Sequence, residues 1–301
     1  MFLNRINTPL EKLLWRIVSD GSERFDTHFD LAVSYIEGGS AYYVHDHVSA
    51  AKKAAFVHVD YVQAGYTRRL DKDCYVDFDR IFAVSDETAG VLAGVYPECQ
   101  QKLSVFHNLI DTEAIRQKAL LPAEKSMHEG IRLLTVGRLT PQKGFDCAVY
   151  ALKLLLEKQY PVYWYIIGEG PEYGRLTQLA RSLHVEDHFI FLGMQTNPYP
   201  YFKMADFYIH ATRFEGKSIA IQEAQVLGCA IAASDCSGNR EQIVSGVDGL
   251  LCPFSPEGIA NAVEYLIEHP QTAQSFGKAA AQKACHFEND IHMIRDLLYS
   301  P

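Results

Sequence analysis

The sequence predicts an α/β protein made of two parallel-sheet domains. Short apolar runs alternate with helical stretches along almost the whole chain, a pattern typical of a parallel sheet covered by helices on both faces. The chain has 301 residues, of which 48% are apolar, and this is enough for two domains of ordinary size. A polar, aperiodic stretch at residues 119–130 separates an earlier series of strand-like runs from a later one, so we expect a linker there.

The first domain is predicted over residues 1–118 and the second over residues 131–286, followed by an amphipathic helix over residues 287–301. The first domain has few strands for a doubly wound domain. Its predicted strands are Leu31–Ser34, Ala54–His58, Ile81–Val84 and Leu103–Phe106. Those of the second domain are Ile131–Val136, Val162–Ile167, Phe189–Leu192, Phe207–His210, Ala230–Ala233 and Gly249–Cys252.

Helices are expected between these strands, and two of them carry start signals. Pro171 opens the helical stretch 171–183 at a first turn, where a proline is tolerated. Residues 255–257 (Ser-Pro-Glu) supply a cap, a proline and an acid at the start of another helix. Residues 2–18 show a basic amphipathic pattern, which fits either a helix packed on its own domain or one lying on an anionic membrane surface.

Composition and charge argue against several function classes. The net charge is −9 and no basic stripe is visible, which argues against nucleic-acid binding. The seven cysteines include no C-x-x-C pair, which argues for a reducing compartment and against a zinc site. No secretory signal pattern is seen, and no apolar run approaches the ~18 residues of a membrane span. We therefore expect a cytoplasmic protein.

Two glutamates, Glu215 and Glu223, are the first candidates for a site. They lie on either side of a predicted helix start, which follows a short apolar run typical of a buried parallel strand. Parallel sheets present ligand sites at such strand-to-helix junctions. The helix N-terminus near Gly216, Lys217 and Ser218 suits a phosphate, whereas the two carboxylates suit sugar hydroxyls. Taken alone, the spacing is a weak signal and usually means two solvated helix acids.

Two cations lie on the loop that follows the first strand of the second domain. Arg138 can hold phosphate oxygens as a fork and Lys143 as a point charge, and Gly137 permits close approach of the backbone. A surface loop with two solvated cations is the alternative. Gly168 begins a second, weaker glycine turn after the next strand. The chain has neither a G-x-G-x-x-G nor a P-loop motif, which argues against dinucleotide and P-loop sites.

One histidine ends a strand of the first domain. His58 follows the apolar run Phe56–Val57, where a histidine can serve as an acid, a base or a hydrogen-bonding group. A single histidine is more often structural, so both interpretations stay open on the pattern alone.

Several segments together carry a family resemblance. In the second domain they read VGRLTPQKGFD, IIGEGPEYGRL, FLGMQTNPYPYFKMADFYIHATRFEGKSIAIQEAQVLGCAIAASDCSGNREQI and VDGLLCPF, and in the first AFVHVDY, DRIFAVSDETAGVL and VFHNLID. They resemble the retaining glycosyltransferases of family 4, often called group 1. The resemblance implies the GT-B fold, with two Rossmann-like domains facing a cleft. It also implies that the N-terminal domain is incomplete, because the family's usual first strand and glycine-rich loop have no counterpart here.

The resemblance also implies roles for the residues named above. Arg138 and Lys143 match the pair that binds the donor diphosphate. Glu215 matches a catalytic-site glutamate beside the donor sugar, and Glu223 matches the glutamate that binds the ribose. His58 matches a histidine near the acceptor and the donor sugar, and we expect it to share the catalytic role. The other expected donor contacts are Gly137, Gly168, Gly216, Lys217 and Ser218, with Met194 and Gln195 at the nucleobase.

The activity implied by the resemblance is transfer of a sugar from a nucleotide diphosphate sugar, with UDP expected, to a saccharide or lipid-linked acceptor. The anomeric configuration would be retained, and neither a metal nor a cofactor is expected. The setting would be cell-surface polysaccharide or lipopolysaccharide synthesis, at the inner face of the membrane, with a homo-oligomer as one state. A non-catalytic or partner-dependent nucleotide-sugar-binding fragment and a GT-B sugar-nucleotide epimerase remain the alternatives.

Overall fold

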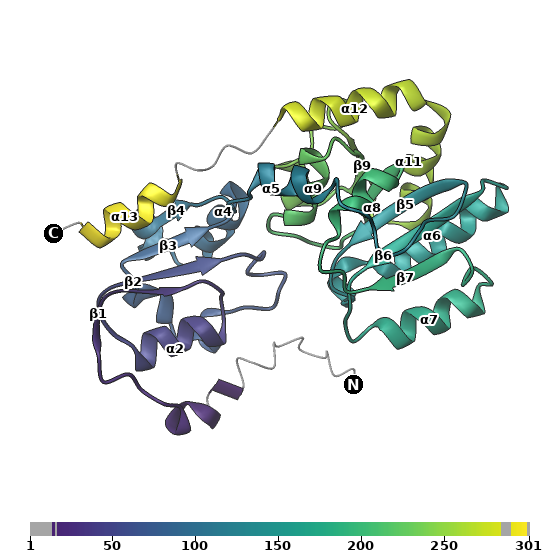
Figure 1. Ribbon diagram of the computed structural model, residues 1–301. Helices are drawn as coiled ribbons and strands as arrows, with labels where there is room; N and C mark the ends of the chain where they lie inside the picture. Colours follow the sequence, from purple (N-terminus) through teal and green to yellow (C-terminus); the bar gives the residue numbers. More distant parts are fainter. Residues whose placement is uncertain (1–13, 16, 284–289, 300–301) are drawn as a thin grey trace. The chain divides into compact units, whose positions relative to one another are not determined.

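The computed structural model describes residues 14–15, 17–283 and 290–299. The chain divides into two compact units (Figure 1). Unit 1 comprises Met1–Leu109 together with His286–Pro301, and unit 2 comprises Ile110–Cys285. Each unit holds one sheet, and the strand pairs within it are parallel. The predicted fold class, α/β with two parallel-sheet domains, is confirmed.

Unit 1 contains a four-stranded sheet in the order β1-β2-β3-β4. The strands are β1 (His28–Ser34), β2 (Ser49–Val57), β3 (Arg80–Ala83) and β4 (Leu103–Val105). The helices are α2 (Gly39–His47), α3 (Arg68–Asp71), α4 (Asp86–Val95) and α13 (Ile291–Tyr299). All the strands predicted for this part of the chain are present. The first two begin earlier than predicted because their opening residues are largely exposed and partly polar.

Different elements cover the two faces of the unit 1 sheet. Because side chains alternate along a strand, Val57 and Phe56 point to opposite faces. Val57 packs in a core with α2 and a group of tyrosines. Phe56 and Phe82 pack with Leu297 of α13 on the other face. The helix predicted at the end of the chain is therefore part of unit 1, although unit 2 precedes it in the sequence.

Unit 2 contains a six-stranded sheet in the order β10-β9-β8-β5-β6-β7. The strands are β5 (Ile131–Val136), β6 (Val162–Ile167), β7 (Phe189–Gly193), β8 (Phe207–His210), β9 (Ala230–Ser234) and β10 (Leu250–Cys252). The helices are α5 (Thr112–Lys118), α6 (Phe145–Glu157), α7 (Tyr173–Ser182), α8 (Tyr199–Met204), α9 (Ile219–Val226), α10 (Ser237–Arg240), α11 (Pro256–Glu268) and α12 (Pro270–Gln282). The predicted strand series is confirmed.

Both faces of this sheet are covered, as the apolar runs predict. Leu133 and Trp164 pack with residues of α6 and α11 on one face. The neighbouring residues Leu134 and Tyr165 point to the other face and pack with residues of α8 and α9. Strands buried on both faces need a continuous apolar sequence, which is why these strands could be predicted from the sequence.

The strand order of unit 2 reverses between β5 and β8. From β5 the chain moves outward through β6 and β7, then returns to the other side of β5 and continues through β8, β9 and β10. Ligands of open parallel sheets bind at the carboxyl ends of the strands where the order reverses. The loops that follow β5 and β8 are therefore where a ligand site is expected.

The boundary between the units differs from the predicted one. We expected the first domain to end at residue 118 and residues 119–130 to link the domains. Instead, α5 packs against α8 and α9, so the division falls between Leu109 and Ile110. The irregular stretch 119–130 is held on unit 2 as well, since Lys125 N donates to Tyr201 Oη at 3.0 Å.

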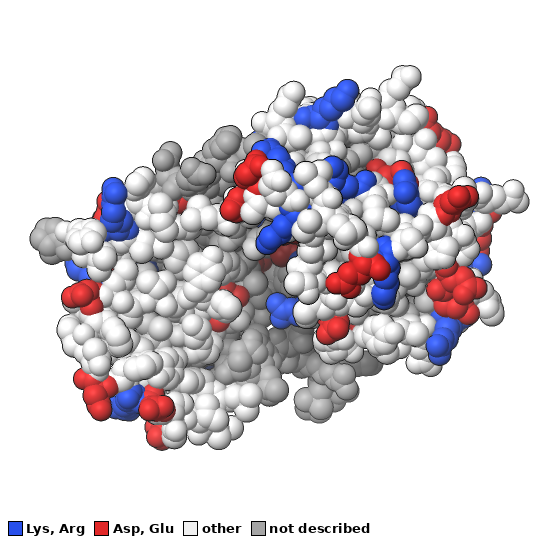
Figure 2. Space-filling view, viewed as in Figure 1, with Lys and Arg blue, Asp and Glu red and all other residues white. Residues whose placement is uncertain are grey.

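Several features bear on partners and location. Residues 2–18, predicted as a basic amphipathic helix, lie mostly outside the described residues. Within the described part of the chain, no helix is long and apolar enough to cross a bilayer. The described cysteines are free thiols. On the face shown in Figure 2, the described Lys and Arg side chains are interspersed with Asp and Glu and form no continuous basic stripe.

Candidate functional site

Two loops of unit 2 form the candidate site. Residues 137–144 follow β5, and residues 211–218 follow β8. Gln142 holds the loops together. Its side-chain Nε2 donates to Phe214 O at 3.0 Å, and its backbone carbonyl accepts from Arg213 N at 2.8 Å. Since β5 and β8 are neighbours in the sheet, these bonds bring Lys143 of one loop beside Glu215 of the other.

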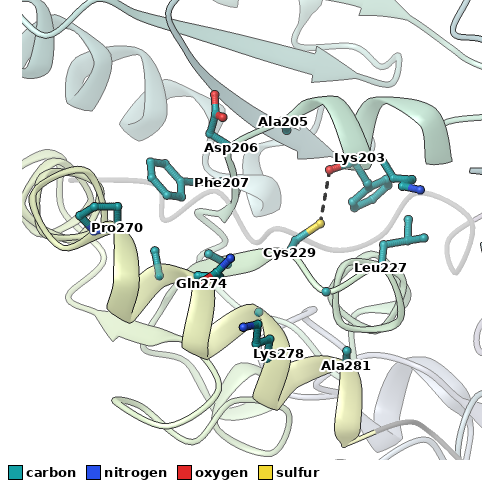
Figure 3. Close-up of a pocket in the computed structure, with 15 residues that line it drawn as sticks. Lys203, Ala205, Asp206, Phe207, Leu227, Cys229, Pro270, Gln274, Lys278 and Ala281 are labelled. Atoms are coloured by element: carbon teal, nitrogen blue, oxygen red, sulfur yellow. Dashed lines mark hydrogen bonds between the residues drawn. The ribbon is translucent and has the colours of Figure 1, made fainter.

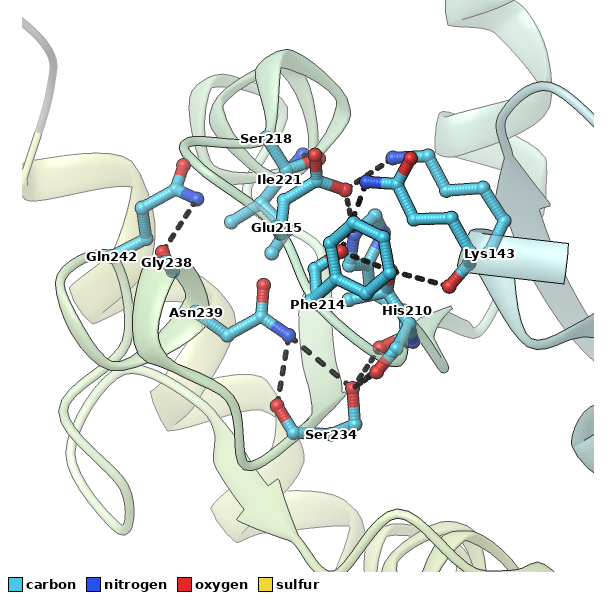
Figure 4. A network of polar contacts seen from close by, with 12 residues as sticks. Lys143, His210, Phe214, Glu215, Ser218, Ile221, Ser234, Gly238, Asn239 and Gln242 are labelled. Carbon is cyan, nitrogen blue, oxygen red and sulfur yellow. Dashed lines mark hydrogen bonds and ion pairs between the residues drawn. The ribbon is translucent and has the colours of Figure 1, made fainter. Parts of the chain in front are cut away.

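Lys143 and Glu215 form an ion pair between these loops (Figure 4). The two side chains are 20% and 10% exposed, so the pair is largely sheltered from water. His210, the last residue of β8, lies next to it, with Nε2 3.5 Å from Glu215 Oε2. A ligand phosphate that reached Lys143 would compete with Glu215 for the ammonium group.

The surroundings shift the pKa values of Glu215 and His210. Burial alone would raise the pKa of Glu215, but the contact with His210 and the charge of Lys143 outweigh it and lower that pKa to about 2. Burial lowers the pKa of His210, and the charge of Lys143 acts in the same direction. At neutral pH, Glu215 is therefore a carboxylate and His210 a neutral imidazole.

His210 has one ring nitrogen without a hydrogen bond. Its Nδ1 lies 3.2 Å from Tyr208 Oη, whereas Nε2 makes no hydrogen bond within the described part of the chain, because the contact with Glu215 is too long for a good one. Buried polar atoms are nearly always hydrogen-bonded, so Nε2 marks a place where a ligand can supply the partner. Sequence reasoning missed His210, since it ends an apolar run.

Glycines allow the loops after β5 and β6 to approach each other. Gly168 has a φ of +142°, and a Cβ there would collide with the carbonyl oxygen of Gly137. Gly137 N donates to Ile167 O at 2.9 Å, which extends the pairing of the two strands into the loops. The stem of Lys143 runs 3.7 Å from where a Cβ on Gly137 would lie. Gly168 thus has a packing reason to be in this site, whereas a Cβ on Gly137 would make only ordinary van der Waals contacts.

Helix α9 begins at the end of the second loop, where the sequence predicts a helix start. Ser218 is its N-cap and accepts from Ile221 N at 3.5 Å, with Gly216 and Lys217 immediately before it. Gly238 of α10 packs against the carbonyl group of Gly216 so closely that a Cβ would collide with it. Helix α10 therefore packs directly against the loop before α9.

Glu223 lies in α9 and accepts a hydrogen bond from Tyr199 Oη of α8 at 3.0 Å. Burial raises the pKa of Glu223, and the bond from Tyr199 offsets only part of the shift. Burial and the neighbouring Glu223 raise the pKa of Tyr199 to about 12, so the hydroxyl keeps its proton and donates. Tyr199 was not predicted, because nothing in the sequence links it to a residue so far along the chain.

Other predicted donor contacts lie at the same end of the sheet. Arg138 follows β5 and is exposed, and its guanidinium makes no hydrogen bond or ion pair with the described residues. Met194 and Gln195 follow β7. Met194 is 72% exposed, whereas Gln195 Nε2 donates to Leu192 O at 2.9 Å. The fold therefore collects the predicted set, apart from His58, at the carboxyl ends of β5 to β8.

His58 follows β2 in unit 1. Its Nε2 lies 2.8 Å from Tyr35 O, and because a carbonyl only accepts, Nε2 carries the hydrogen. Its backbone N donates to Glu37 Oε2 at 2.9 Å, and its ring lies 5.1 Å from that of Tyr35. In the neutral ring, Nδ1 is then an acceptor, and it makes no hydrogen bond among the described residues.

The described residues contain no group of three or more His, Cys, Asp or Glu side chains suited to a metal ion. Asp-x-Asp sequences occur at residues 71–73 and 77–79 of unit 1. Asp71 is buried and accepts hydrogen bonds from Tyr42 and Tyr61, which gives this carboxylate a structural role.

Comparison with known proteins identifies the family. The family model described as "Glycosyl transferases group 1" matches residues 116–283, more than half of the chain. The chain belongs to the group 1 glycosyltransferases. The relatives of this glycosyltransferase include N-acetylgalactosamine-N,N'-diacetylbacillosaminyl-diphospho-undecaprenol 4-alpha-N-acetylgalactosaminyltransferase of Campylobacter jejuni, 30% identical over 200 residues, which cover 66% of this chain and 53% of the relative.

A glycosyltransferase of Haemophilus influenzae is 32% identical over 158 residues, which cover 50% of this chain and 44% of that protein. The chain spans about half the length of the curated relatives it matches.

Solved structures show the fold. Anabaena HepE, in complex with UDP-glucose, superposes with a TM-score of 0.74 at 18% identity, over 97% of this glycosyltransferase and 83% of HepE. Sucrose-phosphate synthase from Thermosynechococcus elongatus also gives a TM-score of 0.74, at 16% identity, over 96% of this chain and 76% of the synthase. The GT-B fold predicted from the sequence is confirmed.

The neutral, buried state of His210 predicts a pH effect on the stability of unit 2. A histidine whose pKa is lower in the folded protein supports the fold at high pH, and this support is lost as pH falls, because only the unfolded chain then takes up the proton readily. Between about pH 7.5 and about pH 5.5, the free energy of unfolding should fall less in His210→Gln than in the wild type.

Urea unfolding can be followed by the fluorescence of Trp164 in a Trp15→Phe background, so that the signal comes from unit 2. His184→Asn, which removes an exposed histidine of unit 2, is the control and should keep the wild-type pH dependence. Equal pH dependence in His210→Gln and the wild type would contradict the assignment.

Proposed function

We propose that this glycosyltransferase belongs to family 4 and transfers a sugar from a UDP-sugar with retention of configuration and without a metal. The observation that carries the proposal is the Lys143–Glu215 ion pair at the reversal of strand order, with Arg138 on the same loop as Lys143. Cations suited to a diphosphate and a carboxylate suited to sugar hydroxyls meet there. Two solved structures of the same fold, Anabaena HepE and S. aureus TarM, hold UDP, which supports UDP as the nucleotide of the donor.

Donor binding exchanges the partners of this ion pair. Arg138 and Lys143 bind the diphosphate, together with the N-terminus of α9. Glu215, released by Lys143, accepts hydrogen bonds from the hydroxyls of the donor sugar, and His210 Nε2 lies close enough to take part. Glu223 accepts from the ribose. The remaining donor contacts are Gly137, Gly168, Met194, Gln195, Gly216, Lys217 and Ser218.

In the transfer step, the bond between the anomeric carbon and the β-phosphate oxygen breaks. The acceptor oxygen forms its bond to the anomeric carbon on the same face, and its proton passes to the leaving phosphate. Arg138 and Lys143 stabilise the negative charge that develops on the leaving nucleotide, and cations held in place before the reaction are effective at this. His58 of unit 1 is proposed to act on the sugar substrates through Nδ1.

The acceptor is proposed to be a saccharide or a lipid-linked saccharide of cell-surface polysaccharide or lipopolysaccharide synthesis. The name of the Campylobacter jejuni relative, which specifies a diphospho-undecaprenol-linked sugar, supports this class. A cytoplasmic protein with peripheral membrane contact fits such an acceptor. The free thiols of the described cysteines fit a reducing compartment.

Removing either cation should weaken nucleotide binding. Arg138→Ala and Lys143→Ala each delete a charge-assisted contact worth about 1.5–3 kcal/mol, so UDP affinity should fall by roughly ten- to a hundredfold. Calorimetric titration with UDP measures the effect. Lys153→Ala, on the exposed side of α6, is the control and should bind as the wild type does. Wild-type affinity in both site variants would remove Arg138 and Lys143 from the site.

Substituting the two glutamates should have different effects on UDP affinity in the same titration. Glu223→Gln should weaken the binding of UDP itself, because the proposed partner of Glu223 is the ribose. Glu215→Gln should not weaken UDP binding, since Glu215 competes for Lys143 in the free site, yet it should impair sugar transfer. Equal loss of UDP affinity in both variants would contradict these roles.

Metal independence makes a third prediction. Binding of a UDP-sugar, and any transfer to an acceptor, should persist in excess EDTA because protein cations neutralise the diphosphate. Titration with and without EDTA, followed by addition of Mg²⁺ or Mn²⁺, tests this. A donor affinity that disappears in EDTA and returns with metal would show that the proposed charge balance is wrong.

A further inference from the structure

A groove outside the donor site lies at the amino ends of β8 and β9 (Figure 3). Its volume is about 520 Å³, within the range of small-molecule sites. The end of α8, the turn between α9 and β9 and one side of α12 line it. The donor loops leave the carboxyl ends of the strands, so the length of β8, about 13 Å, separates them from the groove.

The floor of the groove is apolar and closely packed. Phe202, Leu227 and Ala273 contribute to its lining. A Cβ on Gly277 of α12 would collide with the carbonyl oxygen of Gly228, so the helix rests directly on the turn before β9. This contact closes the floor and fixes its shape. Pockets for organic ligands combine such a floor with a few polar groups.

The charge at the groove is positive in a protein whose net charge is −9. Neither α8 nor α12 contains an acidic residue, and each contributes one lysine, Lys203 and Lys278. Both lysines are exposed and make no hydrogen bond or ion pair with the described residues. The acid of the lining, Asp206, is already bound by Arg132, whose Nε and Nη2 donate to it at 3.0 Å.

The thiol in the groove does not suit covalent or redox chemistry. Cys229 Sγ donates to Phe202 O at 3.5 Å, and burial raises the pKa of this thiol to about 12. A thiol that stays protonated is a poor nucleophile and a poor metal ligand. What the groove offers is therefore an apolar surface beside two cations.

We propose that this groove binds an anionic amphiphile, with a phosphate or carboxylate head on Lys203 and Lys278 and an alkyl chain on the apolar floor. The two lysines, which have no partner among the described residues, attract the head, and the floor removes the first part of the alkyl chain from water. The groove lies at the opposite end of β8 from the donor loops, so its ligand need not touch the donor. The proposal does not depend on the donor chemistry.

Calorimetric titration with decyl phosphate, below its micelle concentration, tests the site. The wild type should bind decyl phosphate at least about tenfold more tightly than either inorganic phosphate or decanol, because each of these supplies only half of the interaction. The double variant Lys203→Gln/Lys278→Gln should lose at least about tenfold in affinity for decyl phosphate. Lys153→Gln/Arg181→Gln removes the same charge from α6 and α7 and should leave the affinity unchanged.

A second variant tests the floor. Ala281→Trp, at the partly buried end of the groove, should weaken decyl phosphate binding, while circular dichroism checks that the fold is retained. The proposal is overturned if the wild type does not bind decyl phosphate, if decanol or inorganic phosphate binds equally well, or if the lysine double variant binds as the wild type does. These outcomes do not depend on UDP binding, so failure here is distinct from failure at the donor site.

Discussion

The candidate site depends on the ion pair between Lys143 and Glu215. Each charge is largely withdrawn from water, and a buried charge without a partner is strongly destabilising. The pair therefore holds together two loops that follow different strands. The hydrogen bonds of Gln142 to the second loop hold the two loops in the same relative position. Arg138, on the same loop as Lys143, is exposed and makes no hydrogen bond or ion pair with the described residues, so under the proposed function it is available to a diphosphate.

The same constraint shapes how a donor is recognised under the proposed function. A nucleotide diphosphate that takes Lys143 leaves Glu215 buried and without its cation, which costs free energy. A nucleotide sugar supplies hydroxyl groups to Glu215, and so offsets that cost. The polar bonds beneath the loop, such as Asn239 Nδ2 to Ser234 O at 2.8 Å, keep the surroundings fixed while partners are exchanged. The site is thereby biased toward the complete donor over the product nucleotide.

The two ends of the unit 2 sheet have different chemistry for physical reasons. At the carboxyl ends, glycines such as Gly168 let backbone loops meet, and charged side chains gather where the strand order reverses. At the amino ends, helix α12 lies on the turn before β9, and its small residues leave an apolar groove with Lys203 and Lys278 in its lining. A ligand at one end therefore has no need to share atoms with a ligand at the other.

The sequence by itself determined the strands of unit 2, the junctions that carry Arg138, Lys143 and Glu215, and the family, because apolar runs, glycine turns and helix starts are local signals. Only the tertiary structure showed that Lys143 pairs with Glu215, that His210 lies beside them, and that Tyr199 donates to Glu223. It also assigned α5 to unit 2 and α13 to unit 1. Periodicity reports which residues face a core, whereas strand order and helix packing decide which distant segments become neighbours.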